Sequence, residues 1–455
     1  MDGQIADEGA ALTYGPVIPM LMRLTVPMIF GIVSLVVFQM ADTYFIGRLG
    51  TRPLAAISYT FPVILVINSI ALGIGLGASA VISRAIGEGN QDRVRVLTTH
   101  SLLLALLIVA GFVLAGLLTI NPLFSLLGAG GDILVLIQQY MNIWYLGMIF
   151  VVVPMIGNNA IRATGDTLTP GLIMVIAAIA NIILDPLLIF GIGPFPRMGI
   201  SGAAVATVLG RSLTFVVALY ILAVREKMIP CPASTVKQML QSWGAILHIG
   251  IPTAISKMIL PLGIGIITRL LSYYGPEAVA AYGVASRIEF FGMTVIIALA
   301  AVAAPFVGQN RGAQLFARIR KGVTGSELFS ITWGVIFGIT VFIFARPLAL
   351  LFNDDPRYVE VLITYLRIVP LFYGLHGVML ITSNALNVLK RPFLAAFLAG
   401  EEMFVFCIPL AWFFSYLLGP AGVFTAISIA FVAAGVTGHF MIKKVINYEE
   451  NSVKK

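Results

Sequence analysis

Twelve apolar segments, each about as long as a membrane-crossing helix, constrain the fold of this chain more than any other feature. A helix needs about 20 consecutive apolar residues to cross a bilayer. Inside the bilayer only helices and closed barrels satisfy every backbone polar group. Because 59% of the residues are hydrophobic and 11% are charged, a soluble domain is excluded. We predict an all-α membrane protein with spans at 16–47, 54–83, 97–120, 134–161, 170–192, 200–224, 244–272, 279–308, 322–345, 358–388, 393–417 and 421–443.

The two halves of the chain resemble each other at a fixed offset. A shift of 225 residues aligns the pairs Pro27/Pro252, Gly50/Gly275, Gly87/Gly312, Tyr140/Tyr365 and Asn159/Asn384. Each half holds six predicted spans, an even number, so both halves enter the membrane in the same direction. The two halves are then expected to be related by a pseudo-twofold axis along the membrane normal. We therefore predict two pseudo-symmetric six-helix lobes at 16–224 and 244–443. A cytoplasmic N-terminal segment (1–15), an interlobe linker (225–243) and a cytoplasmic tail (444–455) complete the chain.

The lysines and arginines between the spans are concentrated in alternate loops, on the side that also holds both ends of the chain. Cytoplasmic loops carry such an excess, so both termini are predicted to be cytoplasmic. The net charge of +8 is thus attributed to topology, and no nucleic-acid partner is expected. The polar, acidic start of the chain does not match a cleavable signal. We expect a multi-pass protein of a bacterial or archaeal cytoplasmic membrane.

The sequence lacks the motifs that ATP hydrolysis and metal binding require. The chain has no G-x-x-x-x-G-K-[ST] phosphate loop, so it is not expected to hydrolyse ATP. Its four histidines and two cysteines do not have the spacing of a metal site. We therefore expect no enzyme activity, no catalytic residue and no cofactor. Transport against a gradient would have to be driven by an ion.

Two aspartates inside predicted spans are the strongest functional signal. A carboxylate costs about 2.5–3.5 kcal/mol at the centre of a spanning helix, so a chain rarely keeps one without a use. Asp42 and Asp185 align with Ile267 and Ile408 in the second half. Since the second half folds without these acids, they are not needed for the fold. The alternative for Asp42 is a side chain that reaches the membrane surface from near a helix end.

Polar residues gather around these acids and can hold a proton or coordinate a small cation through oxygen atoms. Gln39 and Asn181 precede Asp42 and Asp185 by three and four residues, and so share a helix face with them. Ordinary hydrogen bonds between helices are the alternative, which suits Asn159 because Asn384 repeats it. The predicted coupling site consists of Asp42, Asp185, Asn181, Thr207, Asn158 and Gln39.

Two further groups of residues receive a role. Pro27 removes a helix hydrogen bond and makes the first span able to bend, so it is the predicted hinge. In the second half, Arg287 and Glu289 are each predicted to form a structural pair with a residue of another span. Lys257 is the partner considered for them.

Several motifs together resemble the multidrug and toxic compound extrusion (MATE) transporters, over nearly the whole chain. They are ADTYFIGRLG at 41–50, GNNAIRATGD at 157–166, NIILDPLLIFG at 181–191 and GISGAAVAT at 199–207. YGPEAVAAYGVASRIEFF at 274–291 is similar to the DinF-like branch. The resemblance implies the MATE fold and drug export in exchange for H⁺ or Na⁺. It also matches Asp42, Asp185, Asn181 and Thr207 to the family's ion site.

The resemblance extends to the substrate cavity and to sodium. Phe38, Met28, Tyr140 and Met155 are the predicted cavity residues, and a sodium ion would be held by Asp42, Asn181, Asp185, Ala203 and Thr207. Some relatives have a tyrosine one turn before the first acid, where this chain has Phe38 and Gln39.

The function expected from the sequence is a secondary antiporter, a monomer in the lipid bilayer that exports cationic amphipathic drugs. Protons are favoured over sodium as the coupling ion. A flippase for lipid-linked precursors is the alternative, but a diphosphate lipid needs a cationic cavity, whereas the first lobe offers carboxylates. An ion channel is disfavoured by the two-lobe design.

Overall fold

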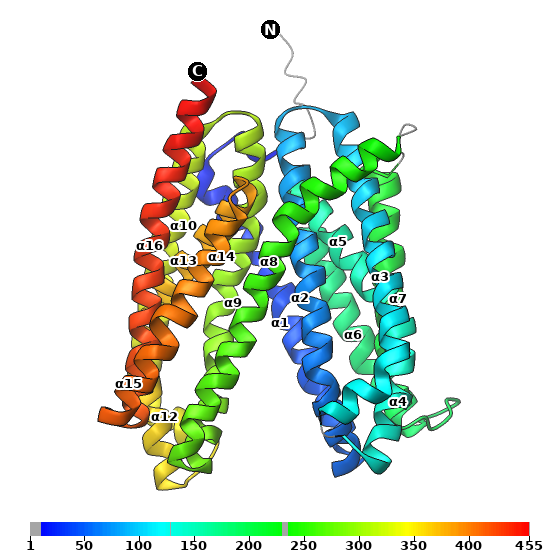
Figure 1. Cartoon of the computed structure of the whole chain (residues 1–455), viewed down its shortest axis with the longest axis vertical. Helices are drawn as coiled ribbons and strands as arrows, with labels where there is room; N and C mark the ends of the chain where they lie inside the picture. Colours follow the sequence, from blue (N-terminus) through cyan, green and yellow to red (C-terminus); the bar gives the residue numbers. More distant parts are fainter. Residues whose placement is uncertain (1–10, 128, 230–234, 455) are drawn as a thin grey trace. The chain divides into compact units, whose positions relative to one another are not determined.

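The computed structural model describes residues 11–127, 129–229 and 235–454, and every regular element in them is helical (Figure 1). The α-helices are α1 (Val17–Gly47), α2 (Thr51–Gly87), α3 (Gln91–Leu126), α4 (Gly131–Leu146), α5 (Ile149–Thr164), α6 (Leu168–Phe190), α7 (Ile200–Tyr220), α8 (Val236–Leu271), α9 (Pro276–Gly312), α10 (Phe316–Ile343), α11 (Ala345–Leu350), α12 (Pro356–Ile368), α13 (Tyr373–Val388), α14 (Pro392–Gly400), α15 (Ile408–Leu418) and α16 (Pro420–Lys454). Short 3₁₀ segments are η1 (Ala11–Thr13), η3 (Ser272–Tyr274) and η4 (Pro370–Phe372), and π-helical segments are η2 (Ile221–Arg225) and η5 (Glu401–Cys407).

The number of spans agrees with the prediction. Eleven helical stretches of the described chain are long and apolar enough to cross a membrane, and the bent pair α4–α5 brings the number to twelve. This pair bends by 45° between Leu146 and Ile149, and Gly147 caps the end of α4. A Cβ atom at Gly147 would collide with the side chain of Val208, so the glycine lets α7 pack against the bend. The predicted all-α membrane fold is therefore confirmed.

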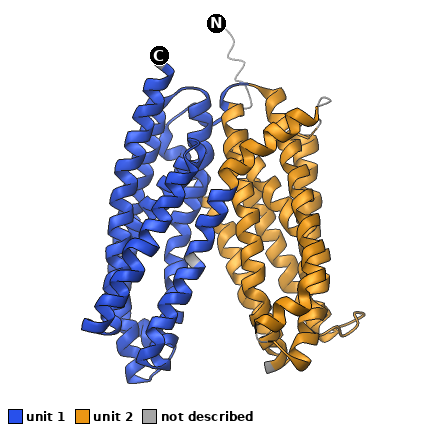
Figure 2. Ribbon diagram, in the orientation of Figure 1, with its two compact units in different colours: residues 1–25, 87–89, 251–455 blue, residues 26–86, 90–250 orange. Residues whose placement is uncertain are grey.

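The chain divides into two compact units (Figure 2). Unit 1 contains residues 1–25, 87–89 and 251–455, and unit 2 contains residues 26–86 and 90–250. The predicted lobes are separated at a linker, whereas the boundaries between the units fall inside helices. In α1 the boundary lies between Thr25 and Val26, and in α8 it lies between Gly250 and Ile251. Both boundaries come one residue before a proline of the repeat, Pro27 or Pro252. Residues 1–10 of the predicted N-terminal segment and 230–234 of the predicted linker lie outside the described residues.

The core of unit 1 is apolar at the positions that mirror the two acids. Ile267 is 2% exposed and belongs to one hydrophobic cluster with Leu362 and Phe424, and Ile408 packs against this cluster. Burying such side chains stabilises each unit by about 25 cal/mol per Å² of apolar surface. The second half therefore uses these two positions for packing.

In unit 2, α1 and α6 cross at two glycines. A Cβ at Gly171 of α6 would lie 2.6 Å from the carbonyl oxygen of Pro27, and one at Gly31 of α1 would lie 3.1 Å from Cα of Gly171. Small residues at such a crossing let two membrane helices approach closely. The contact positions the Pro27 region of α1 against the helix that carries Asp185.

Candidate functional site

Asp185 lies in the interior of unit 2 with a defined partner. Its side chain is 0% exposed, and the side-chain amide of Asn181 lies one turn away on α6. With its NH₂ group turned toward the carboxylate, Asn181 donates to Oδ2 at 2.8 Å and to Oδ1 at 3.1 Å. Its carbonyl oxygen then accepts from the Thr207 N–H at 3.3 Å. This orientation gives a hydrogen-bond partner to both the NH₂ group and the carbonyl oxygen of Asn181. The hydrogen-bond network is the criterion by which the orientation of an amide side chain is assigned.

Asp42 approaches the same cluster from α1. Its charge lies within electrostatic range of Asp185 and of the buried Tyr140 hydroxyl on α4. Oδ1 of Asp42 is buried and accepts no hydrogen bond from the described residues. Since a buried polar atom without a partner is costly, this oxygen is available to a proton or a small cation.

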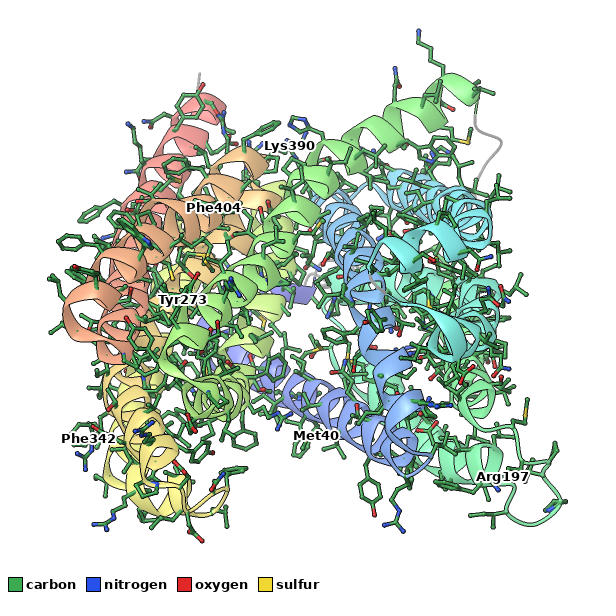
Figure 3. All side chains as sticks on the ribbon, turned by 60° about the horizontal axis from the view of Figure 1, so that its bottom comes forward. Met40, Arg197, Tyr273, Phe342, Lys390 and Phe404 are labelled. Carbon is green, nitrogen blue, oxygen red and sulfur yellow. The ribbon has the colours of Figure 1, made fainter. Side chains whose placement is uncertain are left out.

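The two sides of α1 differ in exposure. Phe38 and Asp42 are one turn apart and share a face, and Phe38 is buried. Met40, visible in Figure 3, is 63% exposed, and Tyr44 one turn later is also exposed. Gln39 is exposed as well, although it was predicted to join Asp42. The helix therefore turns Phe38 and Asp42 toward the interior of unit 2.

The other predicted residues of the coupling site and of the substrate cavity differ in burial and do not share one pocket. Asn158 on α5 is buried, and its Oδ1 has no hydrogen-bond partner among the described residues. Ala203 and Met28 are fully buried, and Met155 is half-buried. A small pocket between α1, α6 and α7 is lined by Phe38, but not by the other three predicted cavity residues. Instead, Asn181 and Arg211 line it with Phe38.

Arg211 is a candidate functional residue that the sequence motifs did not reveal. It lies in α7, one turn after Thr207, and its guanidinium carbon is 6.0 Å from the centre of the Phe38 ring. Its position in the middle of the predicted span 200–224 was the available signal, because an arginine at a helix centre costs about as much as an aspartate. The first half therefore offers a cation in addition to the predicted carboxylates.

The pairing expected in the second half is corrected. Glu289 of α9 accepts a hydrogen bond from the hydroxyl of Tyr365 and makes no ion pair with Lys257 in the described chain. Tyr365 aligns with Tyr140, so a tyrosine of the repeat lies near a carboxylate in each unit. His376 contacts Glu402 at 3.1 Å, and Glu402 lies in the π-helical segment η5.

The carbonyl oxygen of Asn181 faces the Thr207 N–H, whereas its NH₂ group faces the carboxylate of Asp185. In the described residues no group of three or more His, Cys, Asp or Glu side chains could hold a metal ion.

Twelve apolar spans in two repeated halves, with carboxyl groups inside the helical units, define a multi-pass membrane transport protein. The chain belongs to the MATE family of transporters: the family model MatE matches residues 27–187 and matches residues 252–413 a second time. The two matches begin at Pro27 and Pro252, which confirms the internal repeat. The family predicted from the sequence motifs is also confirmed.

Individual relatives differ in the substrates that their names state. The chain is 38% identical to a FAD transporter of Shewanella oneidensis, over 95% of this chain and 96% of that protein. It is 29% identical to the probable multidrug resistance protein NorM of Thermotoga maritima, over 77% of this chain and 76% of that protein. The crystal structure of the Vibrio cholerae MATE transporter VcmN in the bent form is similar, with a TM-score of 0.90 and 30% identity over 97% of this chain and 98% of that chain.

Proposed function

We propose that this protein is a proton-coupled exporter of a flavin dinucleotide, FAD or a close chemical relative. The observation that carries the substrate is the 38% identity to a FAD transporter over nearly the full length of both chains. Such a substrate joins a flat aromatic ring system to a diphosphate. Arg211 and the adjacent ring of Phe38 provide a cation and an aromatic face in unit 2.

Export of cationic amphipathic drugs is the second candidate. It is favoured by the two carboxyl groups, Asp42 and Asp185, in unit 2 and by the similarity to a probable multidrug resistance protein. An acidic interior attracts a cation and repels an anion. The two candidates therefore predict opposite preferences for substrate charge.

The coupling step of the proposal uses Asp42, Asp185, Asn181 and Tyr140. A proton on Asp42 removes a negative charge and turns an acceptor into a group that can also donate. Its neighbours then rearrange, and α1 can adjust at Pro27, where the helix lacks one hydrogen bond. The proposal places the protein in a bacterial or archaeal cytoplasmic membrane, as a monomer with both termini in the cytoplasm.

Ion and substrate can be tested together in proteoliposomes with radiolabelled FAD and with ethidium. In sodium-free buffer with an imposed pH gradient, we expect FAD to accumulate against its gradient and a protonophore to abolish the accumulation. One pH unit supplies about 1.4 kcal/mol per proton, about a tenfold substrate gradient for one-to-one exchange.

Other outcomes would change the proposal in defined ways. Transport of ethidium without FAD would favour the drug exporter. Accumulation that resists the protonophore and requires added sodium would replace the proton by sodium. Movement of a diphosphate lipid in place of both substrates would support the flippase alternative.

The hinge gives a second prediction. Pro27→Ala restores an N–H donor for the carbonyl of Arg23 and stiffens α1 at the point where the helix passes from unit 1 to unit 2. We expect export to slow several-fold while substrate binding at equilibrium is unchanged. The measurement is the initial transport rate together with a binding isotherm for the same preparation.

Pro62→Ala is the matched control, because Pro62 is also inside a helix but is exposed and lies within unit 2 alone. It should transport at the normal rate. Equal slowing by both substitutions would show that any stiffer helix impairs the protein and would remove the special role of Pro27.

A further inference from the structure

Arg211 is a membrane-embedded cation whose charge no residue of the described chain neutralises. It lies in the middle of α7, and its side chain is half-buried. The described residues give its guanidinium group no hydrogen bond and no ion pair, and its contact is the ring of Phe38. An arginine at this depth costs about 2.5–3.5 kcal/mol. Such a cost calls for a partner that is not part of the chain.

The pocket beside Arg211 is built from three helices. Phe38 comes from α1, Asn181 from α6, and Gly210 and Arg211 from α7. Arg211 is the one charged residue among the lining side chains of this pocket. The other lining residues are small or apolar. The lining therefore places one cation beside an aromatic ring.

The second half shows that the fold does not need this arginine. The register that aligns Gly202 with Gly422 places Arg211 on Phe431. Phe431 is buried in unit 1, and its ring stacks on His376 at 4.3 Å between ring centres. A buried aromatic residue thus serves the fold at the mirrored position. The charge of Arg211 has a different use.

We propose that Arg211, together with Phe38, forms an anion subsite that holds a phosphate of a flavin dinucleotide substrate; this inference rests on the proposed function. A guanidinium group binds phosphate oxygens with two parallel N–H groups, which gives affinity and a fixed orientation. The face of Phe38 stacks on a flat ring of the substrate.

Both residues of the subsite lie one helical turn from a residue of the coupling site: Phe38 precedes Asp42, and Arg211 follows Thr207, each by four residues. When ionised, the two acids repel a phosphate, so charge alone would make proton and anion bind together. Exchange of the two therefore requires a link other than charge, and α1 provides one because it carries both Phe38 and Asp42.

The test compares ligands with and without phosphate on the purified full-length protein in nanodiscs. The natural protein is expected to bind FAD more tightly than riboflavin, which has no phosphate. Arg211→Gln should weaken FAD binding by about ten- to a hundredfold and leave riboflavin binding unchanged. Arg211→Lys keeps the charge without the planar fork and should lie between the two.

Two controls separate binding from folding. Arg211→Met keeps a long, flexible side chain without the charge, so it should fold with a normal melting temperature and lose the preference for FAD over riboflavin. Arg197→Gln removes an exposed arginine of the loop between α6 and α7, labelled in Figure 3, and should bind FAD normally.

Each result decides between the two proposals. If the natural protein does not bind FAD, the proposed function fails. If it binds FAD and Arg211→Gln binds FAD equally well, the proposed function stands and the anion subsite is wrong. Equal weakening of FAD and riboflavin by Arg211→Gln would assign Arg211 a structural role and also overturn the subsite.

Discussion

Asp42→Asn should abolish uphill export while the protein folds and inserts normally. Asparagine has nearly the same volume as aspartate but cannot exchange a proton near neutral pH. The substitution also removes the charge that lies within range of Asp185 and Tyr140. In proteoliposomes we expect no substrate accumulation above equilibrium under a pH gradient that drives the natural protein. Downhill exchange can continue, because the substrate subsite is a turn away.

Asp132→Asn is the matched control for this experiment. Asp132 is an exposed aspartate that pairs with Arg52 at 2.7 Å, and exposed ion pairs contribute about 0–1 kcal/mol. This variant should accumulate substrate normally. Uphill export by Asp42→Asn would show that the coupling ion binds elsewhere.

Gly171→Val should destabilise unit 2. A Cβ at Gly171 would lie 2.6 Å from the Pro27 carbonyl oxygen and 3.1 Å from its carbonyl carbon. Both are backbone atoms, so a rotamer change cannot relieve the contact and α1 must move away from α6. Overpacking of this kind costs about 1–3 kcal/mol. We expect a lower melting temperature of the purified protein, together with impaired transport.

Gly111→Val provides the control for helix propensity. Gly111 lies in α3, is exposed, and would have no atom within 4 Å of a new Cβ. Its substitution should leave the melting temperature unchanged, since a helix loses nothing when an exposed glycine is replaced. A normal melting temperature for Gly171→Val as well would mean that α1 and α6 do not pack as closely as the structure shows.

The second half of the chain shows what a repeat can and cannot predict. The alignment of Asp42 with Ile267 predicts that the acid is unnecessary for the fold. The alignment does not make Ile267→Asn a mild control, because Ile267 is buried in the core of unit 1. Burying an unpaired amide there costs about 1–3 kcal/mol. Exposure at a mirrored position depends on neighbours that an alignment does not contain.

The sequence alone determined the spans, the repeat and the two acids, because each follows from a rule that acts within one helix. A bilayer requires long apolar helices with all backbone groups paired, and it makes a buried carboxylate costly wherever the helix packs. The tertiary structure decided which side chains meet across helices. It turned Asn181 toward both Asp185 and Thr207, left Gln39 exposed, and brought Arg211 to Phe38. It also placed the change of unit in α1 just before Pro27, since such boundaries depend on contacts between residues far apart in the chain.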